Sequence, residues 1–159
     1  MKQFKFLLLF LIITGCNDGF YKDHGIEDLW RLPLIKPYEL RNVKGAKRND
    51  SNNDNWHLVF KHNKDTVLLE DGDVHEYYLG VNVTMVNVEN GIIYGYGTAN
   101  PGQSFIINTK TEEERTFEIK EEWQNELIKL NLDFNKLYDV FDLFDDFTEH
   151  QKLKWGSLN

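Results

Sequence analysis

Residues 77–98 hold the feature that most limits how this chain can fold, two runs of β-branched and aromatic residues joined by Asn90-Gly91. An Asn-Gly pair between such runs is typical of a tight turn in which both residues take positive φ, so the runs are predicted to form a β-hairpin. The first run is apolar on both faces, which predicts a strand inside a sheet. Its two faces carry Val81, Val83 and Met85 on one side and Val86 and Val88 on the other.

Further short runs of strand-forming residues lie on either side of this hairpin. They cover residues 38–43, 56–60, 66–70, 104–109 and 115–119. Residues 29–37 are also largely apolar but contain Pro33 and Pro37, which predict an extended connection or an edge strand because proline lacks a backbone N–H. Residues 44–55 are rich in turn formers and are predicted to form an exposed loop. The middle of the chain is therefore predicted to be an antiparallel meander.

The apolar spacing changes from strand-like to helical after residue 119. Trp123, Leu127 and Leu130, with Ile128 alongside, predict a first helix that has Glu121 and Glu122 in its first turn. A second helix is predicted from Asp133 as N-cap, because acidic side chains accept hydrogen bonds from free helix N–H groups. Its apolar stripe consists of Leu137, Val140, Phe141, Phe144 and Phe147. We predict an α+β fold, an antiparallel β-meander followed by two C-terminal helices packed on the sheet.

The amino-terminal residues are arranged like a signal peptide. Lys2 and Lys5 precede an unbroken apolar run at residues 6–13. A helix that crosses a bilayer needs about 20 apolar residues, so this run is predicted to direct export rather than to span the membrane. The chain's only cysteine, Cys16, follows directly and cannot form an intramolecular disulfide.

The four residues Ile13-Thr14-Gly15-Cys16 resemble the lipobox of bacterial lipoproteins. The resemblance implies cleavage after Gly15, a diacylglyceryl group on the sulfur of Cys16 and acylation of the new amino terminus. Two acyl chains hold a protein on a membrane stably, whereas one holds it weakly. The alternative is an ordinary secreted protein in which a cysteine happens to follow the signal.

The remaining chain is predicted to consist of a polar, lipidated tether at residues 16–27 and a single domain at residues 28–159, behind a signal peptide at residues 1–15. Segments such as "LWRLPLIKPYEL", "GYGT" and "SFIINT" are similar to small uncharacterised lipoproteins of the Bacteroidota. That resemblance implies export and an envelope location, and it brings no activity with it.

The charge balance limits the class of partner. The chain has a formal net charge of −8, which becomes −10 without residues 1–15. Nucleic-acid binding requires clustered lysine and arginine and is therefore not expected. An acidic surface favours solubility beside an anionic membrane or binding to a basic protein.

The sequence contains few motifs that indicate a catalytic or metal-binding site. Residues 50–55, "DSNNDN", begin like a calcium loop, but Asn55 and Lys61 occupy the positions of its glycine and glutamate. No two of the five histidines have the spacing of a zinc protease motif, and no metal or other cofactor is expected. The histidines are His24, His57, His62, His75 and His150. Glu70 and Asp73 are the candidate acid pair for a hydrolase.

Two functions from different classes remain after these exclusions. The favoured one is a non-enzymatic envelope lipoprotein that binds another protein, as an accessory, inhibitor or immunity factor, and that should present an exposed apolar or aromatic patch. The alternative is a hydrolase of cell-wall or glycan material, which should contain a concave pocket with carboxyl groups of raised pKa.

Overall fold

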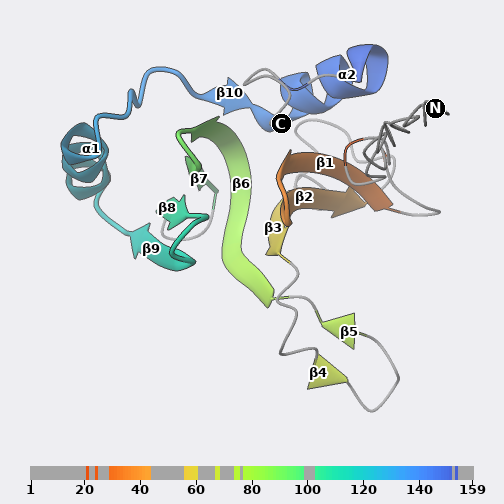
Figure 1. Ribbon diagram of the computed structural model, residues 1–159, viewed down its shortest axis with the longest axis horizontal. Helices are drawn as coiled ribbons and strands as arrows, with labels where there is room; N and C mark the ends of the chain where they lie inside the picture. The colour runs from red at the N-terminus through yellow and green to blue at the C-terminus, as the bar shows by residue number, and fades with distance from the viewer. Residues whose placement is uncertain are drawn as a thin grey trace, which may run out of the picture.

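The computed structural model describes residues 21, 24, 29–43, 56–60, 67–68, 74–75, 77–98, 103–151 and 153. These residues form an α+β fold in which most strands precede the two helices, as predicted (Figure 1). The strands are β1 (Leu29–Ile35), β2 (Tyr38–Val43), β3 (His57–Phe60), β4 (Val67–Leu68), β5 (Val74–His75), β6 (Tyr77–Glu89), β7 (Ile92–Gly97), β8 (Ser104–Asn108), β9 (Glu113–Phe117) and β10 (Tyr138–Asp139). The helices are α1 (Lys120–Lys129) and α2 (Val140–His150).

The main sheet is an antiparallel meander in the order β1-β2-β3-β6-β7-β8-β9. The predicted β6–β7 hairpin is confirmed, with φ of 56° at Asn90 and 78° at Gly91, both in the left-handed region that the Asn-Gly pair adopts readily. β4 and β5 pair with each other in a separate two-stranded sheet. β1, which contains Pro33, lies at one end of the main sheet, in agreement with the edge-strand alternative.

β6 is an internal strand, as predicted, and it has different neighbours along its length. Its first half pairs with β3, from Phe60 opposite Tyr77 to His57 opposite Asn82. On the same edge its second half pairs with β10, where Tyr138 lies opposite Val86. The opposite edge pairs with β7. The short β10 therefore fills the position beside β6 that β3 leaves open.

A β-bulge in β6 corrects the predicted division of its faces. Between β6 and β7 the register shifts, so that Val83 lies opposite Gly97 and Met85 opposite Tyr96. Because the extra residue changes the alternation, Val83 packs in the same cluster as Val86 and Val88 rather than on the other face. Gly95 of β7 permits this arrangement, because a Cβ there would overlap the carbonyl oxygen of Met85.

Two separate hydrophobic clusters lie on the two faces of the sheet. The larger draws buried side chains from β1, β2, β3, β6, β7, β8 and α2, so the sheet curls until its first strands share one core with β7 and β8. The smaller lies under α1 on the other face. Alternation along β7 separates them, since Ile93 belongs to the larger cluster and Tyr94 to the smaller. Both helices pack on the sheet as predicted, but from opposite faces.

The predicted start of the second helix is wrong. α2 begins at Val140, and its N-cap is Asp139, whose carboxylate accepts hydrogen bonds from the backbone N–H of Phe141 and Asp142. Asp133 instead accepts from the backbone N–H of Asn135 in a local turn. Leu137, assigned to the helical stripe, packs against the smaller cluster. Strand β9 also begins two residues earlier than predicted, at Glu113.

Candidate functional site

A hollow of about 270 Å³ lies between α1, the bulged part of β6 and the segment that leads to β10. Met85 and Tyr96 reach it from neighbouring strands, and α1 contributes its first turns. Its described lining residues are Met85, Tyr96, Lys120, Trp123, Gln124, Phe134, Asn135 and Leu137. Sequence reasoning missed this hollow, because its lining comes from segments that only the fold brings together.

Two aromatic side chains fix the shape of the hollow. The rings of Tyr96 and Trp123 meet edge to face, with centroids 6.1 Å apart. The Nε1–H of Trp123 donates a hydrogen bond to the carbonyl oxygen of Phe105 at 3.2 Å, which ties α1 to β8. The Nζ of Lys120 lies 5.9 Å from the centroid of the Tyr96 ring, within the range of a cation–π contact.

The chemistry of this lining suits binding. Met85, Trp123, Phe134 and Leu137 supply apolar surface, while two amides and one ammonium group supply polar contacts. The described lining includes no aspartate, glutamate or histidine, and its titratable side chains are Lys120 and Tyr96. The accessible lining is more polar than apolar, so such a hollow can accept an amphipathic side chain and hydrogen-bond its polar end.

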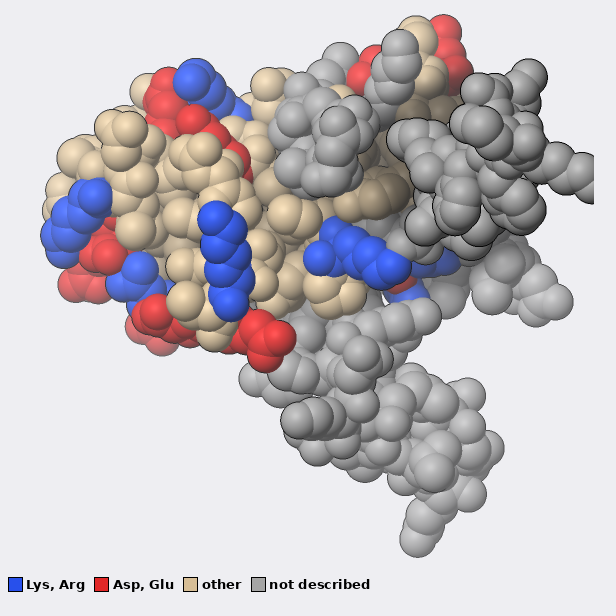
Figure 2. Space-filling view, viewed as in Figure 1, with Lys and Arg blue, Asp and Glu red and all other residues tan. Residues whose placement is uncertain are grey.

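The C-terminal segment that holds most of this hollow, and that includes α2 on the other face of the sheet, also carries the net charge of the whole chain. Residues 103–151 contain thirteen acidic and five basic side chains, a net charge of −8, so the other residues sum to zero. Acidic side chains are visible over α2 and beside β9 (Figure 2). Glu121 and Glu122, directly after Lys120 of the hollow, are exposed.

Glu126 of α1 joins the helix to the sheet. Its carboxylate accepts hydrogen bonds from Lys129 at 2.9 Å and from Arg115 of β9 at 2.8 Å. Both contacts favour the ionised form, so they hold the pKa of Glu126 below its usual value. This direction is opposite to the one that a catalytic acid needs.

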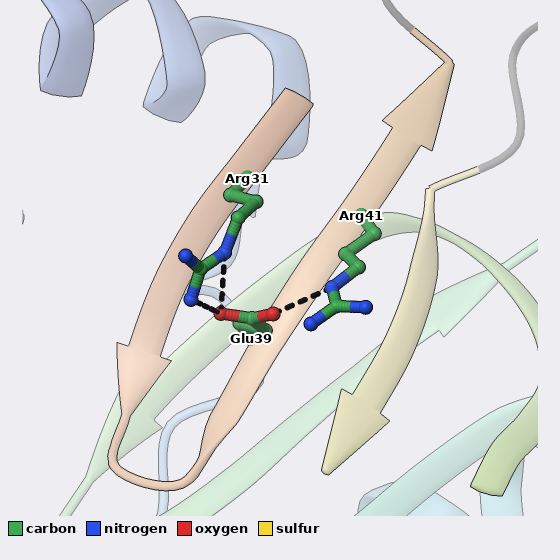
Figure 3. Close-up of polar contacts among 3 residues, drawn as sticks. All are labelled: Arg31, Glu39 and Arg41. Atoms are coloured by element: carbon green, nitrogen blue, oxygen red, sulfur yellow. Dashed lines mark hydrogen bonds and ion pairs between the residues drawn. The ribbon is translucent and has the colours of Figure 1, made fainter. Parts of the chain in front are cut away.

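A second polar cluster lies on the β1–β2 hairpin (Figure 3). Glu39 is buried and accepts hydrogen bonds from the Nε of Arg31 at 3.0 Å and from the Nε of Arg41 at 2.6 Å. Two guanidinium groups thus compensate one buried carboxylate. We interpret this cluster as structural, because the buried carboxylate of Glu39 accepts hydrogen bonds from both guanidinium groups.

Several residues singled out from the sequence lie outside the described residues. They are Cys16, residues 50–55, His62, Glu70 and Asp73. His57 lies in β3, where burial lowers its pKa. His150 lies at the end of α2 beside Asp146, and its Nδ1 is 3.2 Å from the Asp146 carboxylate. Within the described part of the chain, no three potential metal ligands come together.

Exposed apolar surface on the described residues is limited. The large hydrophobic side chains exposed there are Ile119, 51% exposed, and Ile128, 61% exposed. Ile119 is the extended N-cap residue before α1 and Ile128 lies in the last turn of that helix, so the two side chains lie at opposite ends of α1. Among the described helices, none is both long and apolar enough to cross a bilayer.

Comparison of the chain with protein-family models, with curated proteins and with solved structures finds no match. The support for the candidate site is therefore its geometry and its charge.

Proposed function

We propose that this protein is a lipid-anchored protein of a bacterial cell envelope, held to a membrane through Cys16, and that its domain binds a basic protein partner without catalysing a reaction. It would act as an accessory, inhibitor or immunity factor. The observation that carries the partner proposal is the position of the hollow, beside α1 in the C-terminal segment, residues 103–151, that holds the entire net negative charge.

The charge distribution supports a basic partner. Complementary charge raises the rate of encounter and rejects partners of the wrong sign. Glu121 and Glu122 are well placed for this, because they are exposed on α1 beside the hollow.

The hollow supports binding through a central side chain. In protein interfaces most of the affinity comes from a few large side chains that fill pockets on the partner. Met85, Tyr96 and Leu137 offer such a side chain apolar contacts, and Gln124 and Asn135 can hydrogen-bond the adjoining main chain.

Capture from envelope extract tests the partner proposal. Residues 17–159, made without lipid, are immobilised, and retained envelope proteins are identified by mass spectrometry. We expect one stoichiometric partner that is released at high salt. The double variant Glu121→Lys, Glu122→Lys should retain it at least about fivefold less well, because each reversal replaces attraction by repulsion.

A matched double variant provides the control. Asp145→Lys with Glu149→Lys makes the same change of charge at exposed positions of α2, on the other face of the sheet. It should retain the partner nearly as well as the unmodified domain. Equal loss in both double variants would show that the partner responds to the net charge of the domain and not to the surface beside α1. If the unmodified domain retains no partner at all, the proposal is refuted.

Labelling of cells with an alkyne-tagged fatty acid tests the anchor. The protein should incorporate label and sediment with membranes, and Cys16→Ser should abolish both, because the chain contains no other cysteine. Label that persists in Cys16→Ser would contradict attachment at this residue.

A further inference from the structure

The hollow beside α1 differs in charge from the segment around it. Lys120 is the charged side chain of its described lining, to which no aspartate or glutamate contributes. Glu121 and Glu122 follow Lys120 directly, but adjacent helix residues point in different directions. Gln124, four residues along, shares the face of Lys120 and lines the hollow with it. The hollow is therefore a positively charged site within an acidic part of the chain.

Polar side chains of this lining have hydrogen-bonding capacity that their described neighbours do not use. The Lys120 ammonium has no carboxylate partner in the described part of the chain, and its Nζ lies 5.9 Å from the centroid of the Tyr96 ring. No hydrogen bond joins the Tyr96 hydroxyl or the Gln124 amide to another described residue. By contrast, Lys129 at the other end of α1 donates to Glu126 at 2.9 Å. A ligand that enters the hollow thus meets several available donors.

These donors determine which chemical group fits. A lysine ammonium offers three donors and no acceptor, so the occupant must supply acceptor atoms. The side chain of a lysine or arginine would bring two like charges together and is disfavoured. A carboxylate supplies two acceptor oxygens and the opposite charge, and hydrogen bonds to ionised groups are about twice as strong as neutral ones. The polar end of the occupant is therefore expected to be a carboxylate.

The remaining side chains of the hollow fit a short apolar stem. Met85, Phe134 and Leu137 are half-buried and uncharged, and the Tyr96 ring lines the hollow with them. The volume of about 270 Å³ is near the lower end of the range for small-molecule sites, which begins at about 300 Å³. The space thus suits one side chain or one small organic acid.

We propose that the hollow binds a carboxylate carried on a short apolar stem, with Lys120 as its charge partner and Gln124 as a second donor. The inference rests on the proposed function and specifies which chemical group the site beside α1 takes. The carboxylate comes either from the protein partner, as an acidic side chain or a C-terminus, or from a free small acid. The basic residues of the partner then lie outside the hollow, near Glu121 and Glu122.

A single methyl group reports on the hollow. Met85 is the one methionine of residues 17–159, so isotope labelling of methionine methyl groups gives one NMR signal from the domain, which Met85→Leu assigns. The probe is phenylpropionate, whose ring should shift this signal on binding. Phenylpropionamide and phenylpropylammonium carry the same ring with a neutral or a positive head group. We expect the acid to bind at least about fivefold more tightly than the amide, and the ammonium compound to cause no shift.

Lys120→Gln tests the charge partner. Glutamine keeps a polar side chain and removes the charge, so phenylpropionate should bind about fivefold less tightly, while the affinity for phenylpropionamide stays unchanged. Lys129→Gln is the matched control, because it makes the same change of charge on the same helix at a residue that pairs with Glu126 and does not line the hollow. It should leave both affinities unchanged.

Thermal unfolding of both lysine variants shows whether the fold is intact. The inference is overturned if millimolar phenylpropionate leaves the Met85 signal unshifted, or if the acid and the amide bind equally well. An equal loss of affinity in Lys120→Gln and Lys129→Gln would also overturn it, because the acid would then respond only to the net charge of the domain.

The partner captured from extract identifies the source of the carboxylate. If Lys120→Gln and added phenylpropionate both reduce retention of the partner, the carboxylate belongs to the partner. If phenylpropionate shifts the Met85 signal but neither change affects retention, the hollow takes a free small acid.

The same two measurements separate this inference from the proposed function. A partner that is retained by a domain whose Met85 signal does not respond to phenylpropionate leaves the proposed function standing and makes this inference wrong. If no partner is retained, the proposed function fails, and the titration with phenylpropionate still decides whether the hollow binds a carboxylate.

Discussion

The two helices of this protein cover opposite faces of one sheet, and they are built differently. α2 buries Val140, Leu143, Phe144 and Phe147 in the larger cluster and has a side-chain cap at Asp139. α1 buries Trp123 and Leu127 in the smaller cluster, has no side-chain cap and borders the hollow. The difference teaches that the α2 face holds the larger share of the buried apolar side chains, while the α1 face leaves a hollow beside its helix.

Matched truncations of one leucine on each helix give the largest expected effect. Leu143 and Leu127 are both nearly fully buried. Leu143→Ala should lower the free energy of unfolding by about 4 kcal/mol, and Leu127→Ala by about 2 kcal/mol, because the residues around Leu127 can relax towards the hollow. Urea unfolding measures both values. A larger loss for Leu127→Ala would reverse the comparison between the two faces.

The bulge that sends Met85 to the hollow and Val86 to the larger core depends on Gly95. Gly95→Ala should destabilise the protein by about 3 kcal/mol, because the new methyl group meets the backbone carbonyl of Met85 rather than a movable side chain. Thermal unfolding checks this value, with Gly91→Ala as a comparison at a turn position of positive φ. A neutral Gly95→Ala would show that β6 can lose its bulge at little cost.

Buried Tyr94 belongs to the α1 face and predicts a pH dependence. Burial raises its pKa to about 12, and its hydroxyl accepts from the Nδ2 of Asn87 at 2.8 Å. The unfolded chain releases this proton near pH 10 and the folded protein near pH 12, so stability is complete below pH 10 and falls, by about 2 kcal/mol, as the pH rises through this window.

Tyr94→Phe distinguishes this contribution from other titrating groups. The variant should lose much of the fall in stability between pH 10 and pH 12, measured by urea unfolding at each pH. Some fall should remain from Tyr38, whose pKa is also raised, first by burial and then by Glu114. An unchanged fall in Tyr94→Phe would show that the tyrosine contributes nothing to the alkaline loss.

The helix cap gives the smallest expected effect. Asp139→Ala removes the acceptor for two backbone N–H groups of α2 and should cost about 1 kcal/mol. Asp133→Ala, at the position that the sequence pattern favoured, removes a turn contact to Asn135 and should cost less. Chemical denaturation of the two variants compares them, and a larger loss at Asp133 would contradict the observed start of α2.

The elements that the sequence predicted correctly depend on local chemistry. Asn90-Gly91 forms the turn of the central hairpin because few other pairs take positive φ at both positions so easily. The apolar spacing of Trp123 and Leu127 places α1 correctly, since both side chains lie on one side of a helix. The two helices on a meander follow from these local signals.

The predictions that failed concern places where two local sequence signals are equally strong and tertiary packing decides which one is used. Asp133 and Asp139 are both good N-caps, and Asp139 is used because Tyr138 and Asp139 first pair with β6. Strict alternation along β6 predicts that the side chains of Val83 and Val86 point to opposite faces of the sheet, whereas the bulge places both in the larger cluster. The hollow could not be predicted, because residues 85, 96, 120 and 135 approach one another only in the folded chain.

By itself, the sequence determined the class of fold, the central hairpin and the charge of the molecule, because each depends on neighbouring residues or on composition alone. The lipidation of Cys16 remains a prediction from the four residues that end at that cysteine. Only the tertiary structure decided that the helices take opposite faces, that the hollow lies beside α1, and that β9 ends the sheet among the described residues. These features depend on which distant strands pair, and pairing is set by the packing of the whole domain.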